Sequence, residues 1–144
     1  MRLLGYVTSR KFSNFVMPVP AQNACLREYA NSINAEYVLP PLEHFFENCF
    51  MQLFTALNNF QRNDILGIYS VSMLPYDKRK LKEIFEIIKK YDGIIYCILE
   101  AKRIKNVDEA NDLLLSYKLR DYLDQYDQPS IESIRNLIYK SWQM

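Results

Sequence analysis

Thr8, Ser9 and Arg10 form the group of neighbouring side chains with the clearest capacity for chemistry in this sequence. They follow an apolar run, residues 3–7, that is typical of a buried strand. Arg10 carries a guanidinium, which can hold a carboxylate or a phosphate with two hydrogen bonds. Ser9 carries a hydroxyl that donates a hydrogen bond, or acts as a nucleophile when a base lies beside it. We therefore expect Arg10 to bind the charged part of a substrate and Ser9 to take part in catalysis.

Polar side chains also follow each of the three later strands that the sequence predicts. They are, in chain order, Glu43, His44, Ser70, Ser72 and Glu100. In an open parallel sheet a ligand binds beyond the carboxyl ends of the strands, where the strand order reverses. We expect this crevice to contain Ser9, Arg10 and Ser72, with acids from neighbouring strands on either side. The two glutamates are the predicted acid and base of catalysis, and the histidine and the two later serines are predicted to bind substrate.

Each of these residues also has a purely structural explanation. A serine at a strand end commonly satisfies the nearby backbone, and a single histidine in a loop is more often exposed than catalytic. Arg10 can pair with a surface acid, and Glu100 can pair with Lys102 or Arg103. The sequence leaves these alternatives open.

Three more polar residues lie at the predicted starts of helices and complete the predicted substrate-binding set. Gln22 is expected to donate or accept hydrogen bonds with substrate hydroxyls. Asn48 suits an N-cap, because its side chain can accept from the free amides of the first turn. Cys49 lies in that first turn, where the helix dipole favours a thiolate. A small buried apolar residue beside Phe50 is the preferred interpretation of this cysteine.

Strand and helix patterns alternate four times, which predicts an α/β fold with a mainly parallel four-stranded sheet. The expected strands are 3–7, 36–39, 65–71 and 93–99, in the spatial order 2-1-3-4, with helices on both faces making three layers. The expected helices are 21–33, 48–60, 77–91, 107–126 and a short last one that carries Ile131, Ile134, Ile138 and Trp142.

Two helix starts have specific sequence signals. Pro18 and Pro20 suit the entry to the first helix, because proline is tolerated in a first turn. Asp77 suits the N-cap of the third helix. The 144 residues fit a single domain, with a core at 1–105 and a C-terminal helical arm at 107–144.

Composition argues against several classes of site and partner. The net charge is +1, which gives no broad electrostatic attraction to nucleic acid or to an anionic membrane. The three glycines form no phosphate-binding motif, and three scattered cysteines with one histidine form no zinc motif, so we expect no cofactor and no metal. No run approaches the ~20 apolar residues of a membrane helix. With no secretory signal recognised, we expect a cytoplasmic protein without membrane insertion.

The order of elements resembles the catalytic domain of serine recombinases, the resolvase/invertase family. The matching residues are Gly5, Tyr6, Gln22, Asp64, Leu66, Leu74 and Glu100. Members of the family use a nucleophilic serine after the first strand, which Ser9 matches with a one-residue shift. Thr8, Met73 and Tyr76 stand where the family's arginines are expected. The resemblance implies a resolvase-like fold and a dimer formed through helix 107–126, but without those arginines recombination is not expected.

A more specific resemblance is to the sporadic carbohydrate cluster proteins, which are encoded among bacterial surface-polysaccharide genes. The residues that carry it are Gly5, Tyr6, Ser9, Arg10, Phe12, Pro18, Gln22, Asn23, Arg27, Tyr29, Glu43, Asn48, Cys49, Phe50, Tyr69, Ser70, Leu74, Pro75, Leu99 and Glu100. The resemblance implies a cytoplasmic role in O-antigen, capsule or glycan biosynthesis. No catalytic roles come with it.

Together these patterns predict a protein that binds a sugar phosphate or nucleotide sugar, with isomerase, epimerase or hydrolase activity if it is catalytic. A non-catalytic partner or regulator of a glycan-biosynthesis complex is one alternative, and a degenerate recombinase-like protein is the other. Helix 107–126 has more than one apolar stripe, which favours a homodimer. The apolar residues are Leu113, Leu114, Tyr117, Tyr122 and Leu123.

Overall fold

The computed structural model describes residues 1–12, 16–46, 48–124, 135–136 and 138–140. Within them, five strands form one sheet in the order β2-β1-β3-β4-β5. The strands are β1 (Arg2–Gly5), β2 (Glu36–Val38), β3 (Ile65–Ile68), β4 (Ile94–Cys97) and β5 (Lys102–Ile104). The first four run parallel in the predicted order. The mainly parallel α/β fold is therefore confirmed.

The fifth strand corrects the expectation of four. Residues 102–104 lie outside the four expected strands, but they form β5, which pairs antiparallel with β4 at the edge of the sheet. In this strand Ile104 is buried, whereas Lys102 and Arg103 are exposed. Three residues are too few for a periodic pattern, and exposed cations are common on edge strands, where they discourage pairing with other chains. The extended conformation of such a short strand depends on its pairing with the neighbouring strand rather than on a pattern in its own sequence.

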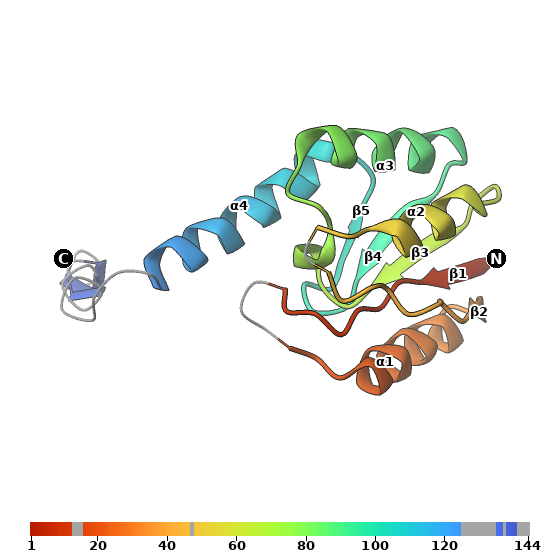
Figure 1. Cartoon of the computed structure of the whole chain (residues 1–144), viewed down its shortest axis with the longest axis horizontal. Helices are drawn as coiled ribbons and strands as arrows, with labels where there is room; N and C mark the ends of the chain where they lie inside the picture. Colours follow the sequence, from red (N-terminus) through yellow and green to blue (C-terminus); the bar gives the residue numbers. More distant parts are fainter. Residues whose placement is uncertain (13–15, 47, 125–134, 137, 141–144) are drawn as a thin grey trace.

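Helices cover both faces of the sheet, as Figure 1 shows. They are α1 (Val19–Ser32), α2 (Met51–Asn58), α3 (Lys78–Lys90) and α4 (Val107–Asp124), with a short 3-10 turn, η1 (Val71–Met73). On the α1 face Leu3 and Ile65 pack with Leu26. On the opposite face Leu4 and Leu66 pack with residues of α2 and α3. Successive strand residues thus bury alternate side chains in two cores, which gives the three expected layers.

Both predicted helix entries are confirmed. Pro18 precedes α1, with a second proline in the first turn. The Asp77 carboxylate accepts a hydrogen bond from the Arg79 amide at 2.9 Å at the start of α3. A last helix was expected to carry Ile131, Ile134 and Trp142, and these three positions lie outside the described residues. The described residues 135–136 and 138–140 are helical.

The approach of α1 to the sheet depends on Gly67. A Cβ atom at this position would lie 2.7 Å from a methyl carbon of Leu3 and 2.9 Å from one of Leu26. A side chain at this position would require these two leucine side chains to shift, so glycine lets α1 pack closely onto β3 with both in place. This contact fixes α1 against the strands whose ends form the site.

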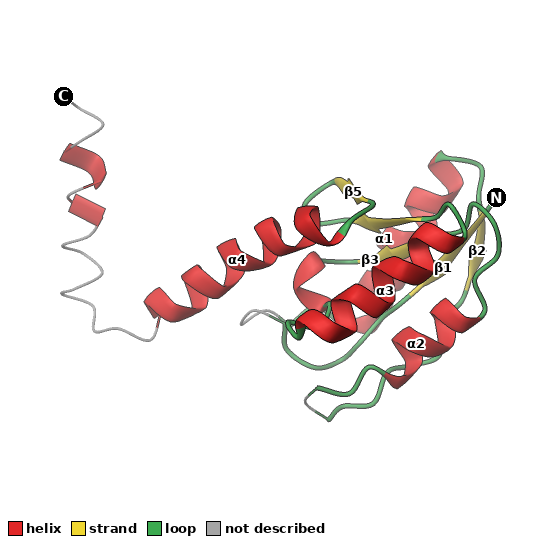
Figure 2. Cartoon of the chain, turned by 90° about the horizontal axis from the view of Figure 1, so that it is seen from above, coloured by secondary structure: helices red, strands yellow, loops and turns green. Residues whose placement is uncertain are grey.

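The helix α4 has two different halves. Its N-terminal half is packed, with Ala110 and Leu114 buried against the core and contacts to η1 and α3. Its C-terminal half extends away from the sheet, as Figures 1 and 2 show. Leu119 and Tyr122 are 58% and 54% exposed there, and Leu115 at the middle of the helix is 66% exposed.

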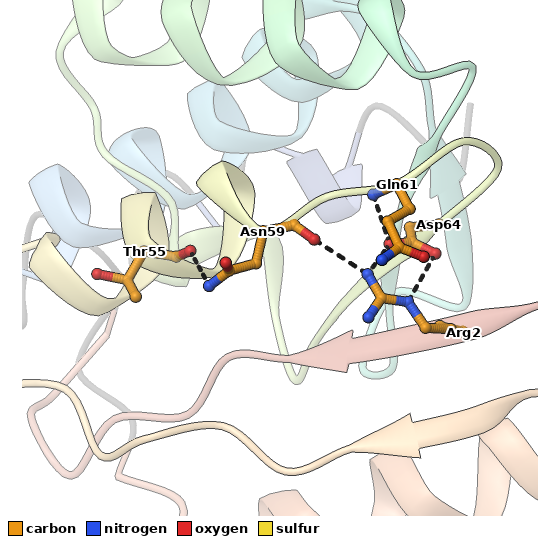
Figure 3. A network of polar contacts seen from close by, with 5 residues as sticks. All are labelled: Arg2, Thr55, Asn59, Gln61 and Asp64. Atoms are coloured by element: carbon orange, nitrogen blue, oxygen red, sulfur yellow. Dashed lines mark hydrogen bonds and ion pairs between the residues drawn. The ribbon is translucent and has the colours of Figure 1, made fainter.

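An ion pair joins the amino ends of two adjacent strands, at the end of the sheet opposite to the predicted site. Arg2 on β1 pairs with Asp64 just before β3 at 2.6 Å, and it also donates to the carbonyl oxygen of Asn59 at 3.0 Å (Figure 3). The same Asp64 oxygen accepts from the amide of Gln61 at 2.7 Å. The hydrogen bond to Asp64 raises the pKa of Arg2. Asp64 thus has a structural role here, joining two adjacent strands.

Candidate functional site

A crevice of about 220 Å³ lies beyond the carboxyl ends of β1 and β3, where the sequence predicted a site. Of the predicted site residues, Arg10, Asn48 and Ser72 line it. Lys11 and Tyr76 also line it, although neither was among the predicted site residues. Among the described residues that form its wall, two carry a positive charge and none carries a negative one. The electrostatics of this crevice therefore suit an anion.

Arg10 is held in place by the loop that precedes α2. Its guanidinium donates to the carbonyl oxygens of Phe46, at 3.0 Å, and Cys49. It also donates to the hydroxyl of Tyr6 at 3.2 Å and lies 4.6 Å from the centre of the Phe50 ring. A guanidinium has five N–H donors, and these contacts orient it. Arg10 is thus a preorganised cation at the wall of the crevice.

Asn48 lines the crevice from a left-handed backbone conformation, with φ 58°. Asparagine tolerates this conformation better than most residues. The prediction that its side chain caps α2 is wrong, because the N-cap position is Phe50, which makes no side-chain capping bond. Asn48 instead lines the same crevice as Arg10.

Glu43 supplies the cap that Asn48 does not. One carboxylate oxygen accepts from the amides of Gln52 and Leu53 in the first turn of α2, at 3.0 and 3.3 Å. The other accepts from the amide of His44 at 3.0 Å and faces the thiol of Cys49 at 3.6 Å. Glu43 is 2% exposed and does not line the crevice. In the structure it satisfies backbone amides at the start of a helix.

Burial raises the pKa of the Tyr6 hydroxyl, and the nearby Glu43 charge raises it further. Tyr6 is 1% exposed and lies between Glu43 and Arg10. Its phenol therefore stays neutral and connects the carboxylate that caps α2 to the guanidinium at the crevice wall. Tyr6 is part of the support of the site, although it lies within the strand pattern that predicts core.

Glu100 belongs to a different cluster, at the ends of β3 and β4. Its Oε1 atom accepts from the hydroxyl of Ser70 at 2.7 Å, the amide of Val71 at 2.8 Å and the hydroxyl of Tyr117 at 3.1 Å. Its Oε2 atom is buried and has no hydrogen-bond partner among the described residues. The alternative explanation, a pairing with Lys102 or Arg103, is not present among the ion pairs of the described residues. Glu100 instead connects β4 to η1 and α4.

Ser70 and Ser72 are buried and share a hydrogen bond of 2.8 Å between their hydroxyl oxygens. Ser70 also caps η1, accepting from the amide of Ser72 at 3.2 Å. Of the residues in this cluster, Ser72 also lines the crevice, whereas Ser70 and Glu100 do not. Burial raises the pKa of Tyr117, and that of Cys97 behind the cluster, and in both cases the Glu100 charge adds to the effect.

Gln22 is completely buried and bonded to the backbone. Its amide nitrogen donates to the carbonyl oxygens of Thr8 at 2.8 Å and Met17 at 2.7 Å, and its oxygen accepts from the amide of Thr8 at 3.3 Å. These three bonds tie the end of β1 to α1. The Gln22 side chain could contact a substrate, as predicted, only after breaking these hydrogen bonds to the backbone.

Three further predicted residues also lie outside the crevice wall. Ser9 is exposed, and His44 is exposed with its ring 6.3 Å from that of Phe46. Cys49 is half-buried, with its thiol facing Glu43. The structure thus brings Arg10, Asn48 and Ser72 together, and it does not bring Ser9 and the two glutamates to one reacting centre.

The described residues contain no cluster of three or more histidine, cysteine, aspartate or glutamate side chains able to hold a metal ion. In the same part of the chain, no helix has the length and apolar character needed to cross a membrane.

The fold is shared with serine recombinases. A resolvase family site-specific recombinase from Streptococcus pneumoniae superposes with a TM-score of 0.53 and 11% identity, over 97% of this chain and 99% of that one. The N-terminal catalytic domain of TP901-1 integrase superposes with a TM-score of 0.52 and 11% sequence identity, over 87% of this chain and 100% of that one. No protein-family model and no curated protein matches the chain, so the resemblance to sporadic carbohydrate cluster proteins finds no support there. The comparisons thus establish a resolvase-like α/β fold.

Proposed function

We propose that this protein binds a small anionic metabolite in the crevice beyond β1 and β3. The observation that carries the proposal is the crevice wall itself, in which a preorganised guanidinium, Arg10, lies with Lys11, Asn48 and Ser72. Guanidinium and ammonium groups suit phosphate or carboxylate oxygens, while amide and hydroxyl groups suit neutral hydroxyls. A sugar phosphate or nucleotide sugar combines these features, and a role in surface-glycan biosynthesis is the setting that the sequence resemblance suggests.

Binding is better supported than turnover. Glu43 caps a helix and Glu100 holds η1 and α4, so neither predicted proton carrier lines the crevice. Recombination is disfavoured by the residues at the three positions where the family's arginines are expected. Thr8 and Met73 are buried there, and Tyr76 lies 5.1 Å from the Lys118 ammonium. We therefore favour a resolvase-like fold used for ligand binding.

Thermal shift against nucleotide sugars, sugar phosphates and inorganic phosphate tests the proposal. Lys11→Ala removes a cation from the crevice wall at an exposed position and should weaken binding about tenfold, the loss of one charged hydrogen bond. Lys89→Ala, on the exposed surface of α3 outside the crevice wall, is the matched control. No shift with any compound, or equal shifts for the two variants, would contradict the proposal.

We also propose a second role, self-association through α4, on a separate observation. Leu115, Leu119 and Tyr122 are exposed and follow the i, i+4, i+7 spacing of one helix face. Light scattering should show a dimer for the wild type and a monomer for Leu115→Ser/Leu119→Ser. A wild-type monomer at every concentration would refute it.

A further inference from the structure

The loop between β2 and α2 exposes a cluster of large apolar side chains, which we call the aromatic loop. It contains Phe45 and Phe46, each 73% exposed, and Leu42 at 56%, and Met51, the first residue of α2, follows it at 62%. In Figure 2 the loop extends beyond the N-terminal end of α2. Single exposed apolar residues are ordinary, but several large ones on one short segment are typical of an interaction surface.

Cations border the aromatic loop. Arg10 donates to the carbonyl oxygen of Phe46, and its guanidinium lies 4.6 Å from the centre of the Phe50 ring. The Lys80 ammonium lies 5.3 Å from the same ring centre, and its side chain lines a surface depression with Met51. Glu47 follows Phe46 in the sequence and lies outside the described residues. The described surroundings therefore combine exposed apolar side chains with positive charge.

The placement of these cations is itself unfavourable for the helix that carries them. Lys78, Arg79 and Lys80 occupy the first turn of α3, which has no acidic residue of its own, and the N-cap Asp77 places one carboxylate against this end of the helix. The positive end of the helix dipole repels cations at this position. An anionic partner would offset this repulsion, so the charge of the surface complements that of an acidic one.

We propose that the aromatic loop docks the protein on a bilayer surface that carries anionic headgroups. Phenylalanine side chains at the tip of a projecting loop can enter the boundary between headgroups and acyl chains, while neighbouring lysine and arginine side chains contact the headgroups. The net charge of +1 conceals this local grouping because it averages over the whole chain. The proposal concerns attachment to a surface, and it does not rest on the ligand proposed for the crevice.

Sedimentation with lipid vesicles tests it. The wild type should bind phosphatidylcholine vesicles that contain phosphatidylglycerol, should bind pure phosphatidylcholine vesicles at least about tenfold more weakly, and should be released by salt. Phe45→Ser/Phe46→Ser should reduce binding about tenfold or more. Leu99→Ser, an exposed apolar position outside the loop, is the control and should bind as the wild type does.

Two results would overturn the proposal. One is an absence of binding to the anionic vesicles, or binding that the two serine substitutions leave unchanged. The other is a wild-type oligomer in light scattering that Phe45→Ser/Phe46→Ser converts to monomer, which would assign the loop to a protein contact. A thermal shift with a soluble ligand that survives in Phe45→Ser/Phe46→Ser separates this surface from the crevice.

Discussion

Glu43 and Glu100 follow different strands of one sheet and serve it in different ways. Both carboxylate oxygens of Glu43 accept hydrogen bonds. The backbone amide donors are that of the next residue, His44, and those of two residues in the first turn of α2. Glu100 concentrates its bonds on one oxygen, receives them from η1 and α4, and leaves the other oxygen buried without a described partner. The first carboxylate completes a helix terminus, whereas the second joins distant elements. The same residue type at equivalent sites in a fold therefore need not share a role.

Glu43→Gln should cause the largest loss of stability. An amide keeps one acceptor and places an NH₂ group against backbone N–H donors in either orientation. The free energy of unfolding should fall by about 3 kcal/mol, because charge-assisted bonds are lost and buried amides are left unpaired. Urea denaturation measures it, with the exposed Glu86→Gln as control, within about 0.5 kcal/mol of wild type. Equal stabilities for the two variants would remove the capping role.

Glu100→Gln should cost no more than about 1 kcal/mol. The amide oxygen can keep the hydrogen bonds from Ser70 and Val71. The NH₂ group then replaces Oε2, the oxygen that has no partner among the described residues. The same urea titration gives the value. A loss as large as that of Glu43→Gln would show that the second oxygen is essential, and the contrast between the two glutamates would disappear.

Tyr117→Phe removes the bond that joins α4 to Glu100 and should lower the free energy of unfolding by about 0.5–1 kcal/mol. In the Glu100→Gln background its effect should be smaller, since the charge that strengthens the bond is absent. A double-mutant cycle measures this coupling. Strict additivity would mean that the charge of Glu100 adds nothing to the strength of the 3.1 Å bond from Tyr117.

Alkaline pH gives the smallest effect and compares the two phenols beside these carboxylates. Burial raises the pKa of both Tyr6 and Tyr117 above the ordinary value of about 10. As pH rises past that value the unfolded chain loses these protons first, so the folded state binds more protons and the free energy of unfolding falls. Tyr6→Phe should flatten this fall more than Tyr117→Phe, because Tyr6 is more deeply buried. Urea midpoints from pH 8 to 11 provide the slopes, and identical slopes would argue against the difference in burial.

The sequence predicts those parts of the fold that depend on local patterns. A mainly parallel sheet covered by helices follows from the alternation of apolar strands and helices, and the Asp77 cap lies two residues from the amide it binds. Contacts between distant residues were missed. Glu43 caps a helix that starts after a loop, and Tyr117 reaches Glu100 from seventeen positions away. Gln22 was assigned to substrate, since the folded position of the Thr8 backbone cannot be read from composition or spacing.

The candidate site shows the same limit. The edge of the sheet was predicted, because it follows from topology, and Arg10 and Ser72 do lie at one crevice. Lys11 was missed because a lysine in a polar loop has no distinguishing pattern. Which strand-end residues face the crevice depends on the turn at Asn48 and on the 3-10 turn at Val71–Met73, and neither has a periodic signal.

The uneven packing of α4 has a consequence for motion along this helix. Amide protons near Ala110 and Leu114 belong to the packed core, so their exchange with solvent requires large-scale opening. Around Leu119 and Tyr122 the helix extends from the body with these side chains exposed, and exchange there needs only fraying of a few turns. Hydrogen exchange should therefore decay along α4 as a gradient, with the Tyr117 contact as the boundary between slow and fast amides.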